Sequence, residues 1–236
     1  MDLNTKSTVL DQIYKIYDDF AGPLNVACKR YCSECCTRNV TLTTLEGYKI
    51  AEYLISHKRS DLYRKLETES DKKRFQPRIT TNALAALCMR GGEPPEEEND
   101  PSYGSCPFLT DNNCPIYPVR PFGCRCFVSK QDCRETGYAD VEPFIIAVNN
   151  LFLQFIEHID AHGYSGNLTD ILLFLESDDN RQSYRNRALK NPPIHLVSNH
   201  SISVVLVSPE HREKAEPILK SLQNIKIPAN QVNEQS

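Results

Sequence analysis

The spacing of apolar residues along the chain predicts a mainly helical protein. Residues 7–20 repeat apolar side chains every three or four positions, which is the pattern of an amphipathic helix. Ser7 or Thr8 is expected to cap this helix. Similar patterns predict six further helices, over about residues 43–57, 60–75, 81–90, 140–161, 167–176 and 208–222.

Local residues mark several helix ends. Thr43 and Glu46 stand three positions apart, in a sequence that resembles a capping box. Gly91-Gly92 is expected to stop the helix that precedes it, and Asn167 to cap the helix that follows it.

Only two short strands are predicted, over residues 194–197 and 202–207, joined by a polar turn. Strands and helices do not alternate as a parallel sheet requires, so the expected fold class is mainly α. We expect a helical domain with irregular cysteine-rich metal-binding loops and a small C-terminal β/α appendage. The predicted domains are a cysteine-cluster metal-binding domain over 1–139 and a helical C-terminal region with a short β element over 140–236. These two regions can also pack as one domain.

The composition excludes several classes of protein. Apolar residues make up 40% of the chain and charged residues 25%, which excludes wholesale disorder. With a formal net charge of −4, the chain lacks the excess of Lys and Arg that nucleic-acid binding needs. The first residues, MDLNTKSTVL, lack the features of a signal peptide, and no apolar stretch is long enough for a membrane span. We therefore expect a cytoplasmic protein with neither nucleic acid nor membrane as a partner.

Ten cysteines are the main chemical feature of the sequence. In a reducing compartment, such a number indicates metal or redox chemistry rather than structural disulfides. Most of them lie in two segments, residues 28–36 and 106–133, about seventy residues apart. Cysteines separated by two residues can direct both sulfurs to one metal from a single turn. A site that draws on both segments would also hold the fold together.

The potential donors are almost purely thiolates. All six histidines lie outside the two cysteine segments, and thiolates select zinc, copper(I) or iron–sulfur clusters over magnesium, calcium or manganese. One tetrahedral zinc needs four ligands, whereas seven to nine cysteines are available. The excess leaves two alternatives open: one cluster with spare thiols, or two metal sites.

Basic residues accompany the cysteines. Thiolates on a metal dication leave a net negative charge, which neighbouring cations stabilise. Arg120 and Arg125 bracket Cys124 in a turn restricted by Pro118 and Pro121. Because a guanidinium can donate hydrogen bonds to sulfur, Arg125 is predicted to bind the cofactor from outside its ligand set.

The cysteine segments resemble the YkgJ family of cysteine-cluster proteins, which is described as chelating zinc or iron. The resemblance covers roughly residues 26–127 and rests on five pieces in order, which are Cys28, CSECC at 32–36, CPFL at 106–109, CPIY at 114–117 and RPFGCR at 120–125. The spacing from Cys28 to Cys32 is one residue longer than the common form. The resemblance implies metal-ligand roles for Cys28, Cys32, Cys35, Cys36, Cys106, Cys114 and Cys124. Cys126, Cys133 and Cys88 fall outside the motif, and Cys88 is expected to be a buried free thiol.

Three functions follow from these observations. The first is a metal-binding protein that holds an iron–sulfur cluster in a structural or redox role. The second is a zinc-stapled protein-interaction module. The third is an iron–sulfur-dependent enzyme, because Cys28-x3-Cys32-x2-Cys35 has the spacing of the radical S-adenosylmethionine signature, and flagellin lysine N-methylases resemble this family. Against the third, Glu34 stands where the radical enzymes carry an aromatic residue, and their strand–helix repeat is not predicted. No catalytic residue, substrate or protein partner is indicated.

Overall fold

The structure is a computed structural model that describes residues 1–226. Helices dominate it, as the sequence predicts. The α-helices are α1 (Leu3–Ala21), α2 (Thr44–Ser56), α3 (Ser60–Thr68), α4 (Thr81–Met89), α5 (Phe122–Arg125), α6 (Cys133–Thr136), α7 (Pro143–Ile159), α8 (Leu168–Glu176), α9 (Asp178–Arg185) and α10 (Arg212–Gln223). Short 3₁₀ turns are η1 (Pro101–Tyr103), η2 (Tyr117–Val119) and η3 (Pro209–His211).

Local sequence predicted two of three helix caps correctly. The capping box of α2 forms, since the Thr43 hydroxyl accepts from Glu46 N and the Glu46 carboxylate accepts from Thr43 N. Asn167 caps α8 as predicted, through a 3.0 Å hydrogen bond from Thr169 N. The predicted cap of α1 is wrong: the helix begins earlier, and Asp2 caps it.

The end of α3 and the presence of α9 also differ from the prediction. Helix α3 ends at Thr68, not near residue 75, because Arg74 donates to the carbonyl of Ser70 and to the carboxylate of Asp170 in α8. These contacts hold the intervening residues in a turn. Helix α9 was not predicted, since its sequence, DDNRQSYR, has no apolar repeat.

A small antiparallel sheet lies at the centre of the molecule. Its strand order is β1 (Thr41–Thr43), β2 (Tyr164–Asn167), β3 (Leu196–Ser198). Strands β1 and β2 were not predicted, because segments of three and four residues rich in Thr, Ser, Gly and Asn show no apolar alternation.

The predicted strand at 202–207 is wrong. Instead, the buried side chain of Gln154 in α7 forms hydrogen bonds with the backbone of this segment. Its amide nitrogen donates to Val204 O at 2.8 Å, and its amide oxygen accepts from Leu206 N at 2.7 Å. A side chain thus takes the hydrogen bonds that a neighbouring strand would otherwise make.

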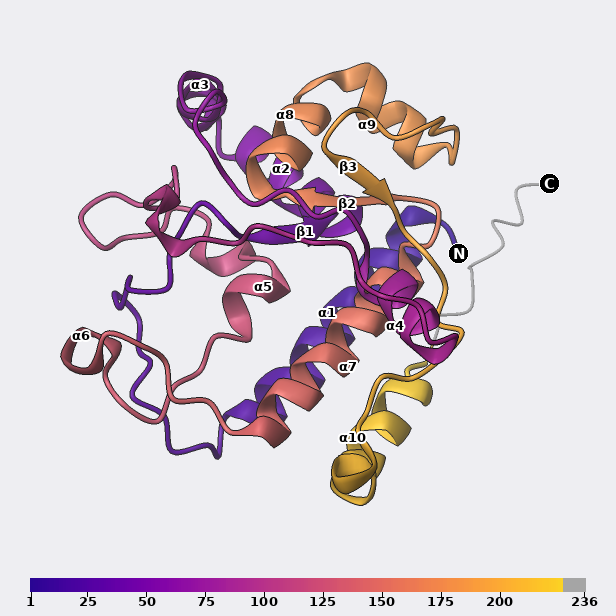
Figure 1. Cartoon of the computed structure of the whole chain (residues 1–236). Helices are drawn as coiled ribbons and strands as arrows, with labels where there is room; N and C mark the ends of the chain where they lie inside the picture. Colours follow the sequence, from indigo (N-terminus) through magenta and orange to yellow (C-terminus); the bar gives the residue numbers. More distant parts are fainter. Residues whose placement is uncertain (227–236) are drawn as a thin grey trace.

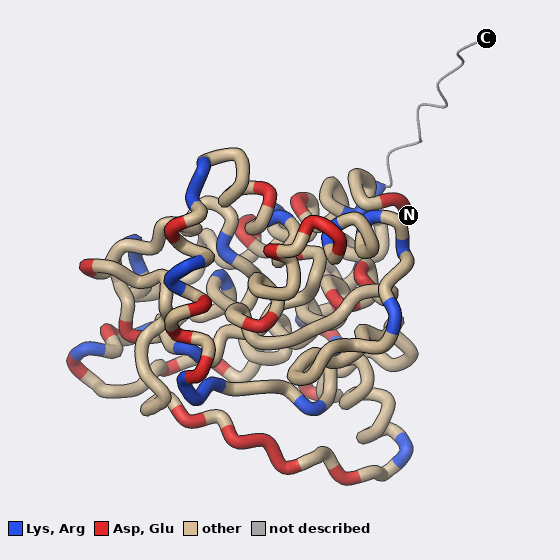
Figure 2. Tube along the Cα trace, turned by 90° about the horizontal axis from the view of Figure 1, so that it is seen from above, with Lys and Arg blue, Asp and Glu red and all other residues tan. Residues whose placement is uncertain are grey.

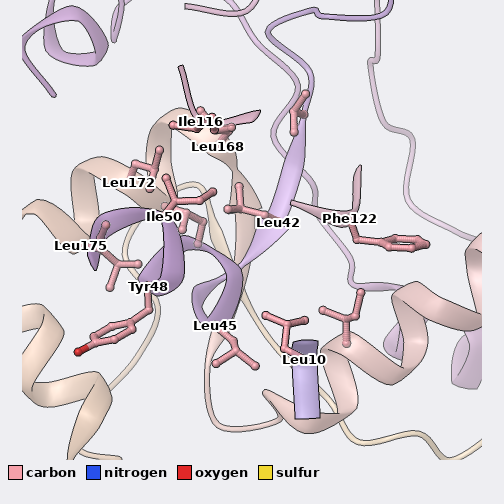
Figure 3. Close-up of a cluster of buried hydrophobic side chains, with 14 of the residues drawn as sticks. Leu10, Leu42, Leu45, Tyr48, Ile50, Ile116, Phe122, Leu168, Leu172 and Leu175 are labelled. Atoms are coloured by element: carbon pink, nitrogen blue, oxygen red, sulfur yellow. The ribbon is translucent and has the colours of Figure 1, made fainter. Parts of the chain in front are cut away.

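The helices pack on both sides of the sheet. Figure 1 shows α2, α3, α8 and α9 gathered on one side, and α1 and α7 running side by side on the other. Leu42, Leu45 and Leu168 belong to one continuous apolar cluster between these layers (Figure 3). Both the sheet and this cluster take residues from either side of the predicted domain boundary at 139–140, and the boundary itself stays a prediction.

A buried ion pair fastens the first helix to the end of α7. Lys6 Nζ lies 3.2 Å from Asp160 Oδ1, and the two side chains are 8% and 0% exposed. Asp160 also accepts hydrogen bonds from the hydroxyls of Tyr184 and Thr44, both at 2.6 Å, and from Leu45 N at 3.0 Å. These donors come from α9 and α2, so one carboxylate joins four helices.

The surface carries mixed charge. Figure 2 shows basic and acidic residues interspersed along the described chain, with one run of acidic residues on an extended segment. In the sequence this run is EPPEEEND, residues 93–100. Within residues 1–226, no helix is long and apolar enough to cross a bilayer.

Candidate metal centre

One cavity brings the two cysteine segments together. It has a volume of about 410 Å³ and lies among α5, the end of α1 and the cysteine loops. Its lining includes all seven cysteines to which the resemblance assigns ligand roles: Cys28, Cys32, Cys35, Cys36, Cys106, Cys114 and Cys124. No histidine of residues 1–226 lines it.

The three remaining cysteines lie elsewhere. Cys126 packs against the apolar core, and burial raises the pKa of its thiol to about 12. Cys133 begins the short helix α6. The prediction that Cys88 is buried is wrong, because helix α4 turns Cys88 toward solvent and buries Asn82 and Ala85 instead.

The second cysteine segment is anchored in the core by residues two positions away from each cysteine. Phe108 follows Cys106, Ile116 follows Cys114 and Phe122 precedes Cys124, and these three apolar side chains are 0%, 2% and 0% exposed. Ile116 and Phe122 point into the central apolar cluster (Figure 3). Each of these cysteines thus stands two residues from a buried apolar anchor, which explains why the motifs CPFL, CPIY and RPFGC pair cysteine with a large apolar residue.

A buried carboxylate fixes the helix that presents Cys124. Glu46 of α2 accepts a 2.7 Å hydrogen bond from Phe122 N, at the start of α5. The same carboxylate accepts from the Tyr14 hydroxyl at 2.8 Å and from Thr43 N at 2.9 Å, and burial raises its pKa. The sequence identifies Glu46 as a capping residue, but its bond to a residue 76 positions away has no local signal.

The first cysteine segment has no such anchor. None of residues 28–36 is buried, and backbone hydrogen bonds hold the segment at its ends. Ala27 N donates to Ser129 O at 2.8 Å, and Cys106 N donates to Cys36 O, also at 2.8 Å. The second of these bonds joins the two cysteine segments directly.

The extra residue between Cys28 and Cys32 is accommodated by a local turn. Tyr31 adopts a left-handed conformation with φ of 72°, and Cys32 N donates to Lys29 O at 3.1 Å. Both cysteines line the cavity despite the longer spacing.

Burial and mutual proximity make the thiols poor acids. Burial raises the pKa of Cys106 to about 11. The pKa of Cys124 is raised well above its ordinary value, first by burial and then by the charges of Cys106, Cys114 and Cys35. A metal cation would supply the compensating charge that ionised thiolates lack here.

The seven thiols suit zinc or iron as ligands. Their side chains are spread around the cavity. As they stand in residues 1–226, no three Cys, His, Asp or Glu side chains are close enough together to hold one metal ion. Seven sulfurs on one cavity are nevertheless soft ligands of the kind that zinc and iron–sulfur clusters use. Binding would require cysteine side chains to turn toward the metal.

Arg125 also lines the cavity, and its guanidinium contacts neighbouring residues of the chain. Its Nε donates to Arg120 O at 3.0 Å and its Nη2 to Pro118 O at 3.3 Å. The guanidinium lies 4.3 Å from the centre of the Tyr14 ring and 3.8 Å from the carboxylate of Asp18. These contacts stabilise the loop before Cys124, and a role of Arg125 toward the cofactor stays a prediction.

Seven thiols from two distant segments around one cavity define a cysteine-cluster protein. Residues 27–143 match the model of the CxxCxxCC family, whose description is "putative zinc- or iron-chelating domain". This match covers just under half of the chain and confirms the YkgJ-type resemblance of its cysteine segments. No curated protein and no solved structure matches the chain.

Proposed function

We propose that this protein holds an iron–sulfur cluster in the cysteine cavity, in a structural or redox role. The observation that carries the proposal is the convergence of seven thiols from two segments on one cavity of about 410 Å³. The description of the matched family, a "putative zinc- or iron-chelating domain", supports iron or zinc as the metal. Reduced thiols and a surface of mixed charge support a cytoplasmic protein without nucleic acid or membrane partners.

The spacing of the cysteines favours a cluster over a single zinc. Their number does not decide between the two, because one zinc ion and one iron–sulfur cluster each take four cysteines. A Zn–S bond of about 2.3 Å places the four sulfurs about 3.8 Å from one another. The cysteines here are spread around the cavity instead, and a cluster, whose thiolates bind different irons, suits a wider spacing.

The cavity also favours a second candidate, an iron–sulfur-dependent enzyme. Its volume falls within the range of small-molecule sites, roughly 300–1,000 Å³, and its wall includes apolar residues such as Val26, Leu109 and Phe127. A closed structural zinc site needs no such space. A ligand that lies beside the metal would use this part of the cavity.

The metal and sulfide content of protein purified without oxygen tests the proposal. Brown protein with broad absorption near about 400 nm, iron and acid-labile sulfide is expected. Colourless protein with stoichiometric zinc and no sulfide would establish the zinc-stapled module instead.

A matched pair of variants tests the site itself. Cys124 lines the cavity and Cys126, two residues later, does not, although both pack against the core. Cys124→Ser should abolish metal loading, because it removes a ligand, whereas Cys126→Ser should keep the metal. Equal metal loss in both variants would contradict the assignment of the cavity as the metal centre.

A further inference from the structure

Arg120 lies in the cysteine cavity with a buried donor that no protein group accepts. Its guanidinium carbon is 3.9 Å from the centre of the Tyr117 ring, and the residue lines the cavity. Its Nε is buried and has no hydrogen-bond partner in the described part of the chain. Burying a donor without an acceptor is unfavourable, so this position indicates an acceptor that the protein itself does not provide.

No carboxylate of residues 1–226 accepts a hydrogen bond from the buried Nε of Arg120. Within residues 1–226, Asp18 is the single acidic residue that lines the cavity, and it lies 3.8 Å from Arg125. Four basic residues line the cavity: Lys29, Arg30, Arg120 and Arg125. The cavity is therefore positively charged unless its thiols are ionised or an anion enters.

The two arginines of the RPFGCR segment are engaged differently. Arg125 donates to two carbonyls and stacks on Tyr14, so its donors stabilise the loop. Arg120 is held by stacking on Tyr117, three residues before it in the turn. Arg120 lines the same cavity as Cys114 and Cys124, so its guanidinium lies on the side of the loop that faces the sulfurs.

We propose that Arg120, positioned by Tyr117, neutralises the metal–thiolate centre and donates a hydrogen bond to its sulfur. This inference rests on the proposed metal site and assigns to Arg120 the contact that the sequence suggested for Arg125. Thiolates bound to a metal remain good hydrogen-bond acceptors, and the planar guanidinium can donate from several nitrogens at once. Arg120 is thus a positioning and charge-balancing residue, not a ligand.

The test compares anaerobically purified wild type with Arg120→Ala, Arg120→Lys and Arg125→Ala. Metal and sulfide content, the rate of metal release to an excess of chelator, the reduction potential and the Tm are measured for each protein. Arg120→Ala should load metal and release it about ten- to a hundredfold faster, as loss of an outer hydrogen-bond partner does in other metal sites. Its reduction potential should fall, because adding an electron is harder without the nearby cation. Arg120→Lys should have a release rate and a reduction potential between those of wild type and Arg120→Ala, since it keeps the charge and loses the planar fork.

Arg125→Ala is the matched control, with a lower Tm and a smaller change in metal release expected. If Arg120→Ala does not fold, Arg120→Lys and Tyr117→Leu decide: faster release at an unchanged Tm supports the inference, and wild-type release in both overturns it. Wild-type release and potential in a folded Arg120→Ala protein also overturn it. Wild type that contains no metal would instead overturn the proposed function.

Discussion

At the scale of single residues, Glu46 connects the core to the metal centre without being a candidate ligand. One carboxylate satisfies the backbone of Phe122 and Thr43 and the hydroxyl of Tyr14. All of these groups are buried or lie at the start of a helix. Cys124 is two residues from Phe122, so the position of its sulfur depends on a residue of another helix.

Glu46→Ala should therefore destabilise the protein by about 2–4 kcal/mol, because each buried donor left without an acceptor costs about 1–3 kcal/mol. Thr43→Ala, which removes the side-chain cap alone, should cost about 1 kcal/mol. Urea denaturation of the two variants measures the difference. Equal losses would mean that Glu46 acts as a helix cap and that its bond to Phe122 contributes nothing to stability.

The cysteines that the motif names and those that line the cavity are the same, and their roles as ligands stay a prediction. The seven cysteines of the motif all reach one cavity, and Cys126 and Cys133, outside the motif, do not line it. Side-chain direction was harder to predict. Cys88 is exposed because a nine-residue helix buries one narrow face, and the carbonyls that Arg125 contacts depend on the folded shape of the loop.

At the scale of elements, the two cysteine segments differ in how they are held. Residues 106–124 place Phe108, Ile116 and Phe122 in the core, whereas residues 28–36 bury no side chain. A segment with few buried apolar contacts opens locally at low free energy. A bound metal would therefore stabilise the first segment more than the second.

Removing the metal with a chelator should increase hydrogen exchange most strongly in residues 28–36. Backbone amides of 114–126 should gain less exchange, because the core anchors stay in place. Helix α9, none of whose residues lines the cavity, serves as the internal reference. Hydrogen exchange followed by mass spectrometry measures all three regions in one experiment. A larger gain in 114–126 than in 28–36 would contradict this account of the loops.

Elements were predictable where their apolar spacing is long and regular, as in α1, α2 and α7. The strand predicted at 194–197 overlaps β3. Strands β1 and β2 were not predicted, because they owe their hydrogen bonds to each other across more than 120 residues. The strand at 202–207 was predicted wrongly for a single reason. The side chain of Gln154 forms the backbone hydrogen bonds that a neighbouring strand would make. Both errors concern pairing partners, about which local spacing carries no information.

At the scale of the whole molecule, stability depends on the buried pair of Lys6 and Asp160. Burial raises the pKa of Asp160, and the charge of Lys6 lowers it. Removing the lysine should therefore raise this pKa further. A carboxyl with a higher pKa in the folded state loses stability as pH rises from its unfolded to its folded pKa.

Lys6→Met should accordingly cost about 3–5 kcal/mol near neutral pH, as breaking a buried ion pair does. The cost should shrink toward about pH 4, the unfolded pKa of aspartate, because both proteins then carry a protonated Asp160. Urea denaturation of variant and wild type at several pH values gives the difference, in which effects common to both proteins cancel. A cost that is independent of pH would show that Asp160 remains neutral throughout.

The sheet has a consequence for how the protein is made. Strand β1 emerges from the ribosome soon after the first cysteine segment, but its partner β2 ends at residue 167, more than 120 residues later. The last cavity cysteine, Cys124, precedes that point. A nascent chain therefore exposes the four cysteines of the first segment and an unpaired strand until residue 167 has been synthesised. Stable metal insertion belongs after that point, and a chain that stalls before residue 124 presents thiols to the cell with no cavity to receive the metal.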